Sequence, residues 1–337
     1  METKYLELPW EEPGWLERAT TWIDASLAQA GRIRLAAVEI LHQRPWSTFA
    51  RVITDKGVAF FKAPAPPFSR FEARLTQALG RRRPDCTVPL LGVDLNQGWM
   101  LSEEAGVTLR SAHPGIEQIA DWERLLPQAA ELQIEMAGRV PELLGLGMFD
   151  RRLSALPQLF DEIMQAEENL RVGLEPGLKQ EEYERLLRMG PQLKAWCEEL
   201  AALGLPETLT HEELHDANVL VNGDRFILTD WSDSSVAHPF FLMVVTTRAA
   251  AYRLELDENG PEIRKLRDAY LEPWTRFAGH GQLARALPLA YRLGMLNRAL
   301  SWHHGTGALA PRHKEADADA VPEWLRDFLK GDVPFRD

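Results

Sequence analysis

Strand-like and helix-like patterns occupy different parts of this 337-residue sequence, and this segregation most limits how the chain can fold. Within the first hundred residues, runs rich in branched and aromatic side chains predict strands at 34–43, 48–55, 58–63 and, as a pair, within 88–104. Asp55-Lys56-Gly57 joins two of these runs as a hairpin turn. Helical spacing predicts helices at 14–30 and 68–80, the second beginning near Ser69.

From about residue 105 onward, helical spacing dominates the sequence. It predicts helices at 115–137, 152–170, 179–203, 239–256, 260–277 and 281–303, with a short one at 322–330. The exception is VNGDRFILTDW, a hairpin whose turn is Asn222-Gly223-Asp224. The sequence therefore predicts an α+β fold in two parts, a β-rich region at 1–103 and a mainly helical region at 104–337.

Composition excludes several classes of protein. Hydrophobic residues make up 45% and charged residues 26%, which is typical of a folded soluble protein. A formal net charge of −12 argues against nucleic-acid binding, since phosphate contacts need a surplus of Lys and Arg. No segment approaches 18 consecutive apolar residues, so no membrane contact is expected. With two cysteines and no basic-then-apolar leader in METKYLELPWEEPGW, we expect a reduced, cytoplasmic location.

The stretch HEELHDANVLV at 211–221 fits two incompatible chemistries. The first is H-E-x-x-H, in which two histidines on one helix face bind zinc and the glutamate is the general base of a metalloprotease. A helix is disfavoured here because Gly204 and Pro206 precede the motif and a predicted hairpin follows His215 closely. The usual third ligand is also missing, since no glutamate lies between Glu213 and Glu255, although an aspartate such as Asp230 could serve.

The second chemistry is phosphoryl transfer. A loop carboxylate accepts a hydroxyl proton, an asparagine five positions later binds magnesium, and an aspartate beyond a hairpin binds it as well. Glu213, Asn218 and Asp230 have this spacing. Because magnesium prefers oxygen ligands and takes few from the protein, we expect Asn218 and Asp230 to supply them. Glu213 would then face the incoming hydroxyl.

The stretch HEELHDANVLVNGDRFILTDWSDSSVAHP resembles the signature region of the aminoglycoside phosphotransferase and choline kinase family, small-molecule relatives of protein kinases. Those proteins carry H-G-D-x-x-x-x-N, a short hairpin and then D-W. The matching residues are His211, Asn218, Asp230 and Trp231. The resemblance implies a two-lobed protein-kinase-like fold and transfer of the γ-phosphoryl group of ATP or GTP, with Mg²⁺, to a hydroxyl of a small molecule.

The resemblance also implies a nucleotide site in the β-rich region. Lys62 ends the third predicted strand, where family members place the lysine that contacts the α- and β-phosphates, and Glu72 on the next helix is placed to pair with it. The loop HQRPWSTFARV contains no glycine, so the backbone and side chains of Ser47 and Thr48 would cover the phosphates. The segment 99–109 resembles the hinge that faces adenine, at Ser102, Glu103 and Glu104.

Three departures from the family pattern bear on activity. Glu213 stands where the family has its catalytic aspartate, and Glu212 replaces a small residue. A misplacement of about 1 Å can cost on the order of 10²-fold in rate, so Asp216 is considered as a substitute acid. The alternative is a pseudokinase-type protein that binds nucleotide without transfer. His238 replaces a later acid of the family.

The acceptor is expected to bind to the helical region. Asp233 in DWSDSS, with the acids of LELDENG, suits an amine-bearing acceptor such as an aminoglycoside, choline or an amino sugar. The pattern does not distinguish ATP from GTP, one acceptor from another, or a monomer from an oligomer.

Overall fold

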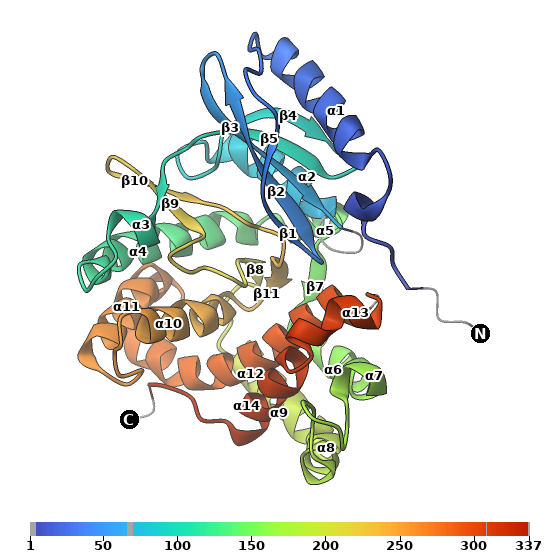
Figure 1. Ribbon diagram of the computed structural model, residues 1–337. Helices are drawn as coiled ribbons and strands as arrows, with labels where there is room; N and C mark the ends of the chain where they lie inside the picture. The colour runs from blue at the N-terminus through green and yellow to red at the C-terminus, as the bar shows by residue number, and fades with distance from the viewer. Residues whose placement is uncertain (1–4, 66–69, 308, 336–337) are drawn as a thin grey trace. The chain divides into compact units, whose positions relative to one another are not determined.

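The computed structural model describes residues 5–65, 70–307 and 309–335 (Figure 1). The chain divides into two compact units. The first contains the described residues up to Thr108, together with Ala217–Asp233 and His304–Lys314. The second contains Leu109–Asp216, Ser234–His303 and the described residues from Glu315 onward.

The first unit is built on a five-stranded antiparallel sheet with strand order β1-β2-β3-β5-β4. The strands are β1 Glu39–Arg44, β2 Ser47–Thr54, β3 Gly57–Pro64, β4 Leu90–Asp94 and β5 Trp99–Glu103. The β2–β3 hairpin and the β4–β5 pair form where the sequence predicts them. β1 starts later than expected, because Arg34 makes only an isolated bridge to Thr54 outside the continuous ladder.

Helices cover this sheet and complete its core. α1 Trp15–Gln29 buries Trp15, Ala19, Ile23 and Leu27 against sheet residues that include Val52, Phe61 and Leu101. Burial of large apolar side chains at this helical spacing is what stabilises the pairing of helix and sheet. A 3-10 turn, η1 Pro9–Glu11, precedes α1, and α2 Arg70–Arg82 carries Glu72 in its first turn. The predicted start of this helix at Ser69 lies outside the described residues.

A second, three-stranded sheet of the first unit has the order β10-β9-β6, from β9 Val219–Asn222, β10 Arg225–Leu228 and β6 Val107–Thr108. The hairpin turn has Gly223 at φ +60°, a conformation that favours glycine. Pairing of β6 with β9, and the bond from Leu228 N to Cys86 O, tie this hairpin to the β-rich region. The first unit is therefore not limited to the predicted range 1–103, because strand pairing joins segments that are distant in sequence.

The second unit is mainly helical. Its helices are α3 Leu109–Ala112, α4 Gln118–Ala137, α5 Val140–Gly145, α6 Leu156–Met164, α7 Glu167–Leu170, α8 Gln180–Leu187, α9 Gly190–Ala201, η2 Pro239–Phe241, α10 Leu242–Arg253, α11 Pro261–Leu271, η3 Glu272–Arg276, α12 His280–Gly307, η4 Glu315–Asp317 and α14 Ala320–Lys330. The last turn of α12, and α13 Pro311–Lys314, belong to the first unit. Three short strands, β7 Phe149–Arg151, β8 Thr208–Thr210 and β11 Ser235–Ala237, form a sheet of order β7-β11-β8 that the sequence did not predict.

Two predicted long helices are interrupted. The range 179–203 forms α8 and α9, which are separated at Arg188-Met189, and Pro191 stands in the first turn of α9. Proline fits the first turn of a helix but cannot continue one from before, so it marks a new start. The range 152–170 similarly forms α6, with Pro157 in its first turn, and the short α7. Within the described residues, no helix is both long and apolar enough to cross a membrane.

Candidate active site

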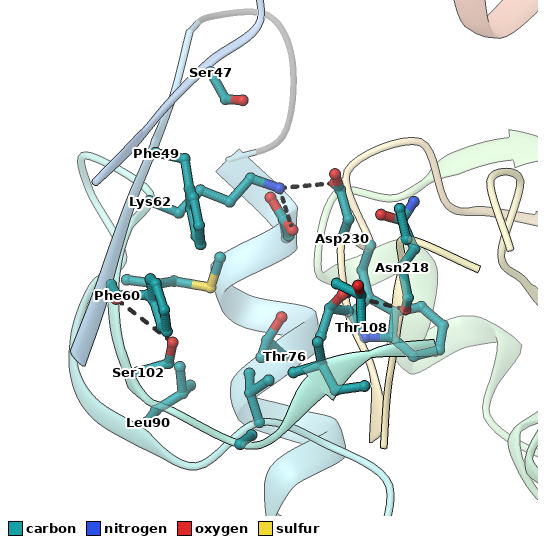
Figure 2. Close-up of a pocket in the computed structure, with 18 of the residues that line it drawn as sticks. Ser47, Phe49, Phe60, Lys62, Thr76, Leu90, Ser102, Thr108, Asn218 and Asp230 are labelled. Carbon is teal, nitrogen blue, oxygen red and sulfur yellow. Dashed lines mark hydrogen bonds and ion pairs between the residues drawn. The ribbon is translucent and has the colours of Figure 1, made fainter. Parts of the chain in front are cut away.

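Lys62, on β3, connects two carboxylates in the first unit. Its Nζ lies 2.8 Å from Oε1 of Glu72 on α2 and 2.7 Å from Oδ1 of Asp230, which follows β10 (Figure 2). The Glu72 side chain is only 2% exposed and that of Lys62 13%, whereas that of Asp230 is 39% exposed. The structure therefore pairs Lys62 with Glu72, as expected from the sequence, and adds Asp230 as a second partner of the same ammonium.

Burial and charge act in opposite directions on this cluster. Burial by itself would lower the pKa of Lys62, but the negative charges of Asp230 and Glu72 outweigh burial and raise its pKa above the usual value. Burial raises the pKa of Glu72 to about 7, although the nearby Lys62 ammonium opposes this. Lys62 thus stays charged, while Glu72 titrates close to neutral pH.

The β9–β10 hairpin holds Asn218 and Asp230 at its open end. Asn218 precedes β9, and its carbonyl oxygen accepts hydrogen bonds from Thr229 N at 3.0 Å and Thr229 Oγ1 at 3.2 Å. Asp230 has φ +61°, which is unusual for a residue other than glycine, and Ser232 Oγ donates to its Oδ1 at 2.7 Å. Figure 2 shows the Asn218 and Asp230 side chains next to each other, extending in the same direction.

These side chains line a pocket of about 430 Å³, all of whose lining residues belong to the first unit. The lining residues are His42, Trp46, Ser47, Phe49, Phe60, Lys62, Glu72, Thr76, Val88, Leu90, Met100, Ser102, Glu103, Ala105, Gly106, Thr108, Ala217, Asn218, Leu220, Thr229, Asp230 and Trp231. The charged and amide groups in the wall are those of Lys62, Glu72, Asn218 and Asp230, together with Glu103, and much of the remaining wall is apolar. A pocket with these properties can hold a flat apolar group beside an anionic one.

A stack of rings in the pocket wall was missed by sequence analysis. The Phe49 and Phe60 rings are 5.3 Å apart and almost parallel, and the His42 ring stacks on Phe49 at 5.5 Å. A signal was present, because alternate residues of a strand point to the same face. Phe60 is two residues before Lys62 on β3 and therefore shares its face. Burial, with the charges of Lys62 and Arg44, lowers the pKa of His42.

The other residues expected to contact nucleotide divide into two groups. Ser47, Ser102 and Glu103 line the pocket, while Thr48 and Glu104 do not. Thr48 is completely buried within β2, since strand alternation turns it to the opposite face from Ser47. The backbone N–H of Glu104 donates to Val58 O, and Ala105 and Gly106 line the pocket next to it.

Glu213 and Asp216 both lie in the second unit, and each is paired with an arginine. The Glu213 carboxylate contacts Nη2 of Arg298 at 2.6 Å, with 29% of its side chain exposed. Asp216 is 4% exposed and contacts Nη2 of Arg110 at 2.7 Å and Nε of Arg253 at 3.7 Å. Burial would raise the pKa of Asp216, but the hydrogen bond and charge of Arg110 lower it below its usual range. Asp216 therefore has the environment of a structural ion pair.

Asp233 and His238 follow Asp230 in the chain. His238 caps the 3-10 turn η2, where its Nδ1 accepts from Phe240 N at 3.3 Å. This is the hydrogen bond that an aspartate at this position would make, so the histidine replaces the capping function of the acid. Burial lowers the pKa of His238 to about 3, so the ring is neutral. Asp233 is half-buried and does not line the pocket.

The sequence model of the phosphotransferase enzyme family (APH) matches residues 46–280, which is more than half of the chain. The chain belongs to this family. It is a phosphotransferase that acts on hydroxyl groups of small molecules. No curated protein sequence matches the chain.

Solved structures of low sequence identity share the fold of this phosphotransferase. Macrolide 2'-phosphotransferase type I is 16% identical, with a TM-score of 0.56 over 90% of this chain and 97% of its own. An ethanolamine kinase from Plasmodium vivax is 13% identical, with a TM-score of 0.62 over 96% and 90%. Spectinomycin phosphotransferase, in complex with ADP and spectinomycin, is 11% identical, with a TM-score of 0.50 over 93% and 96%. The predicted α+β, protein-kinase-like fold class is confirmed.

In this phosphotransferase, the H-E-x-x-H stretch at 211–215 does not have the geometry that a zinc protease requires. Residues 211–215 form no helix, so His211 and His215 are not placed on one helix face. His211 Nδ1 instead accepts a hydrogen bond from Glu213 N at 3.2 Å. Among the residues that the structure describes, no group of three or more His, Cys, Asp and Glu side chains could hold a metal ion. Without the helix, H-E-x-x-H lacks the arrangement of two histidines on one helix face that a zinc protease uses.

Proposed function

We propose that this phosphotransferase moves the γ-phosphoryl group of a nucleoside triphosphate to a hydroxyl of a small, amine-bearing molecule. The observation that carries the proposal is the contact of one lysine ammonium, Lys62, with both Glu72 and Asp230 in a pocket that also contains Asn218. Phosphoryl transfer depends mainly on positioning and on neutralising phosphate charge, and this pocket supplies groups for both.

The residues present fit a divalent cation. Asn218 and Asp230 offer an amide oxygen and a carboxylate oxygen, which are ligands that Mg²⁺ prefers, and phosphates or water would complete the shell. The Lys62 ammonium already lies 2.7 Å from Oδ1 of Asp230, so positive charge is accommodated there. Asn218 and Asp230 would hold Mg²⁺, which when bound neutralises charge on the phosphates.

The apolar wall and the cation give the pocket two ends. Phe49, Phe60 and Met100 provide surfaces for a flat base, and Lys62 provides a charge for the α- and β-phosphates. Glu72, almost completely buried, fixes the Lys62 side chain by accepting a hydrogen bond from it. The related spectinomycin phosphotransferase was solved with ADP, which supports an adenine nucleotide as donor.

Glu213 is the proposed base because it is five residues before Asn218, the spacing of the catalytic carboxylate in the family. As the new bond from the acceptor oxygen to the γ-phosphorus forms, the bond from phosphorus to the β,γ-bridging oxygen breaks and the diphosphate leaves with the electron pair. The hydroxyl proton passes to the Glu213 carboxylate. Asp216 is less suited to this role because two arginines contact it and its pKa is lowered.

An amine-bearing acceptor is supported by charge and by similarity. The net charge of −12 favours cations over anions near the surface. Asp233 adds a carboxylate three residues after Asp230, one of the two proposed magnesium ligands. One structure of the same fold is an ethanolamine kinase, whose named substrate carries an amine. Replacing Asp233 by asparagine should therefore raise KM for an amine acceptor without changing KM for nucleotide.

The test is transfer to a panel of hydroxyl compounds, including choline, ethanolamine, aminoglycosides and macrolides, with Mg²⁺–ATP or Mg²⁺–GTP. Product is identified by mass spectrometry and ADP or GDP release is measured in parallel. We expect a phosphorylated acceptor with the unmodified protein, at least a 10²-fold loss in Asp230→Ala, and unchanged activity in Asp224→Ala, an acid in the nearby hairpin turn. Transfer that survives in Asp230→Ala would refute the assignment.

A nucleotide-binding protein without transfer is the second candidate. The observation that favours it is the ion pair of Glu213 with Arg298, since an engaged carboxylate is a weaker base. Calorimetric binding of Mg²⁺–ATP, combined with no acceptor phosphorylated above the rate of hydrolysis, would establish this second function in place of the first.

A further inference from the structure

Two departures from the family motif lie in one buried charge cluster of the second unit. Glu212 and Glu213, which replace a small residue and an aspartate, face the arginines Arg151 and Arg298. Arg151 is 1% exposed, Glu212 2% and Arg298 3%. Two acids and two arginines have no net charge together, so the cluster can be buried without leaving an uncompensated charge.

Glu212 is fixed in this cluster by hydrogen bonds. Ser235 Oγ on β11 and Asn297 Nδ2 on α12 both donate to its carboxylate. Arg151 on β7 donates to the backbone oxygen of Asn297 at 3.3 Å and to Ser301 Oγ. The first acid of the motif is therefore held on two sides, by the short sheet and by α12.

Glu213 is held from the same helix. Nη2 of Arg298, the residue after Asn297, donates to its Oε1 at 2.6 Å, although the two residues are 85 positions apart in the chain. The backbone of the motif is also anchored, since Thr246 Oγ1 on α10 donates to the carbonyl oxygen of Leu214 at 2.8 Å. Two consecutive residues of α12 thus contact the two glutamates that distinguish this chain from the family pattern.

A glutamate has one more rotatable bond than an aspartate, so its carboxylate samples more positions unless something fixes it. Loss of position by about 1 Å can cost on the order of 10²-fold in rate. An almost completely buried guanidinium with a short contact removes this freedom, because its planar donor group is itself held by packing.

We propose that Arg298 is a positioning residue for phosphoryl transfer, which fixes the longer Glu213 side chain where the family has an aspartate. This rests on the proposed function. Arg298 acts through Glu213 and does not touch the reacting atoms. Glu213 and Arg298 are therefore coupled, so that the contribution of each residue to kcat depends on the presence of the other.

The activity test uses a double-mutant cycle with Arg298→Met, Glu213→Gln and both together. We expect Arg298→Met to lower kcat at least tenfold with KM for Mg²⁺–ATP within twofold, and Arg298→Lys to restore part of the loss. In the Glu213→Gln background, Arg298→Met should change kcat by less than threefold. The control Arg285→Met removes an exposed arginine of the same helix and should leave kcat unchanged. Losses that multiply in the double variant would overturn the proposal.

A second readout does not require activity. Thermal unfolding is measured for the unmodified protein, Arg298→Met, Glu213→Gln and the double variant. The fall in Tm of the double variant should be smaller than the sum of the two single falls, because each single substitution already removes the contact between Arg298 and Glu213. Additive falls in Tm, in a protein that transfers phosphate, would refute the positioning role and leave the proposed function standing. Non-additive falls in a protein that transfers nothing would refute the proposed function and support the contact.

Discussion

Lys62 Nζ lies 2.7 Å from Oδ1 of Asp230, although 168 residues separate them in the chain. The same ammonium lies 2.8 Å from Oε1 of Glu72 on α2. Through this one cation, the strand, the helix and the hairpin that form the pocket are electrostatically coupled. Changes to any member should therefore affect both the stability of the first unit and its affinity for phosphate.

Replacing Lys62 by methionine should weaken both binding and folding. We expect the Kd for Mg²⁺–ATP to rise at least tenfold, since the cation that we propose faces the phosphates is lost. Breaking a buried pair typically costs about 3–5 kcal/mol, so Tm should also fall clearly. Calorimetry and thermal unfolding measure the two effects. Lys56→Met, at an exposed position in the β2–β3 turn, is the control and should change neither, and an unchanged Kd in Lys62→Met would contradict the assignment.

Glu72 should make stability depend on pH near neutrality. Its pKa of about 7 in the folded protein is above the ordinary 4.5, so between these values the folded state binds a proton that the unfolded state does not. The unfolding free energy attributable to Glu72 therefore falls as pH rises from 4.5 to 7. At about 1.4 kcal/mol per pKa unit, the whole effect is at most about 3.5 kcal/mol.

Glu72→Gln has no titratable side chain at position 72, so its unfolding free energy should not show the decline attributed to Glu72 as pH rises. The measurement is the difference in unfolding free energy between the unmodified protein and Glu72→Gln at pH 5 and pH 7.5. We expect the unmodified protein to lose more stability over this interval than the variant. Parallel pH profiles for the two proteins would show that Glu72 is already ionised in the folded state at pH 5.

His238 should lower the stability of the protein as pH decreases, the opposite pH dependence to that of Glu72. Its pKa of about 3 in the folded protein lies below the ordinary 6.5, so the unfolded state binds the extra proton and the unfolding free energy falls as pH decreases below 6.5. His238→Asn removes the titration, while the amide oxygen can still accept from Phe240 N. Relative to its value at pH 7, the stability of the unmodified protein at pH 4.5 should fall by about 2–3 kcal/mol more than that of the variant.

The control for this comparison is His280→Asn, because His280 is an exposed histidine at the start of α12. Its acid-induced loss of stability should equal that of the unmodified protein. If His238→Asn also follows the unmodified protein between pH 7 and 4.5, the ring does not remain neutral in the folded chain.

Substitution of Asp216 should mainly lower stability, whereas substitution of Glu213 should mainly lower kcat. Asp216→Asn removes the ion pair with Arg110, so we expect a loss of about 1–2 kcal/mol of unfolding free energy and a kcat within threefold of the unmodified protein. Glu213→Gln should lower kcat at least tenfold. Parallel measurements of kcat and Tm for the two variants test this, and the reverse pattern would make Asp216 the base.

Much of the candidate site could be located from local sequence order, with the resemblance to the family giving its residues their expected roles. Lys62 near the end of a strand, Glu72 on the next helix, and Asn218 and Asp230 at the two ends of a hairpin are local features that periodicity and turn residues reveal. Hairpins bring their two ends together whatever the rest of the chain does, so the Asn218–Asp230 pair needs little tertiary information. Phe60 could have been added from strand alternation.

The arginine partners could not have been predicted in the same way. Arg110, Arg151 and Arg298 lie on α3, β7 and α12, and an arginine side chain ordinarily faces solvent. Their contacts with Asp216, Glu212 and Glu213 join positions far apart in the chain, and nothing in the local pattern specifies which acid meets which arginine.

The amino-acid sequence by itself determined the strands of the five-stranded sheet, the β9–β10 hairpin, most of the helices and the order of Lys62, Glu72, Asn218 and Asp230 along the chain, because hydrophobic period and turn chemistry act over a few residues. Tertiary structure alone decided that β6 pairs with β9, that Lys62 reaches Asp230, and that α12 holds both glutamates of the motif. These contacts depend on which surfaces pack together, and packing is a property of the whole chain that no short window contains.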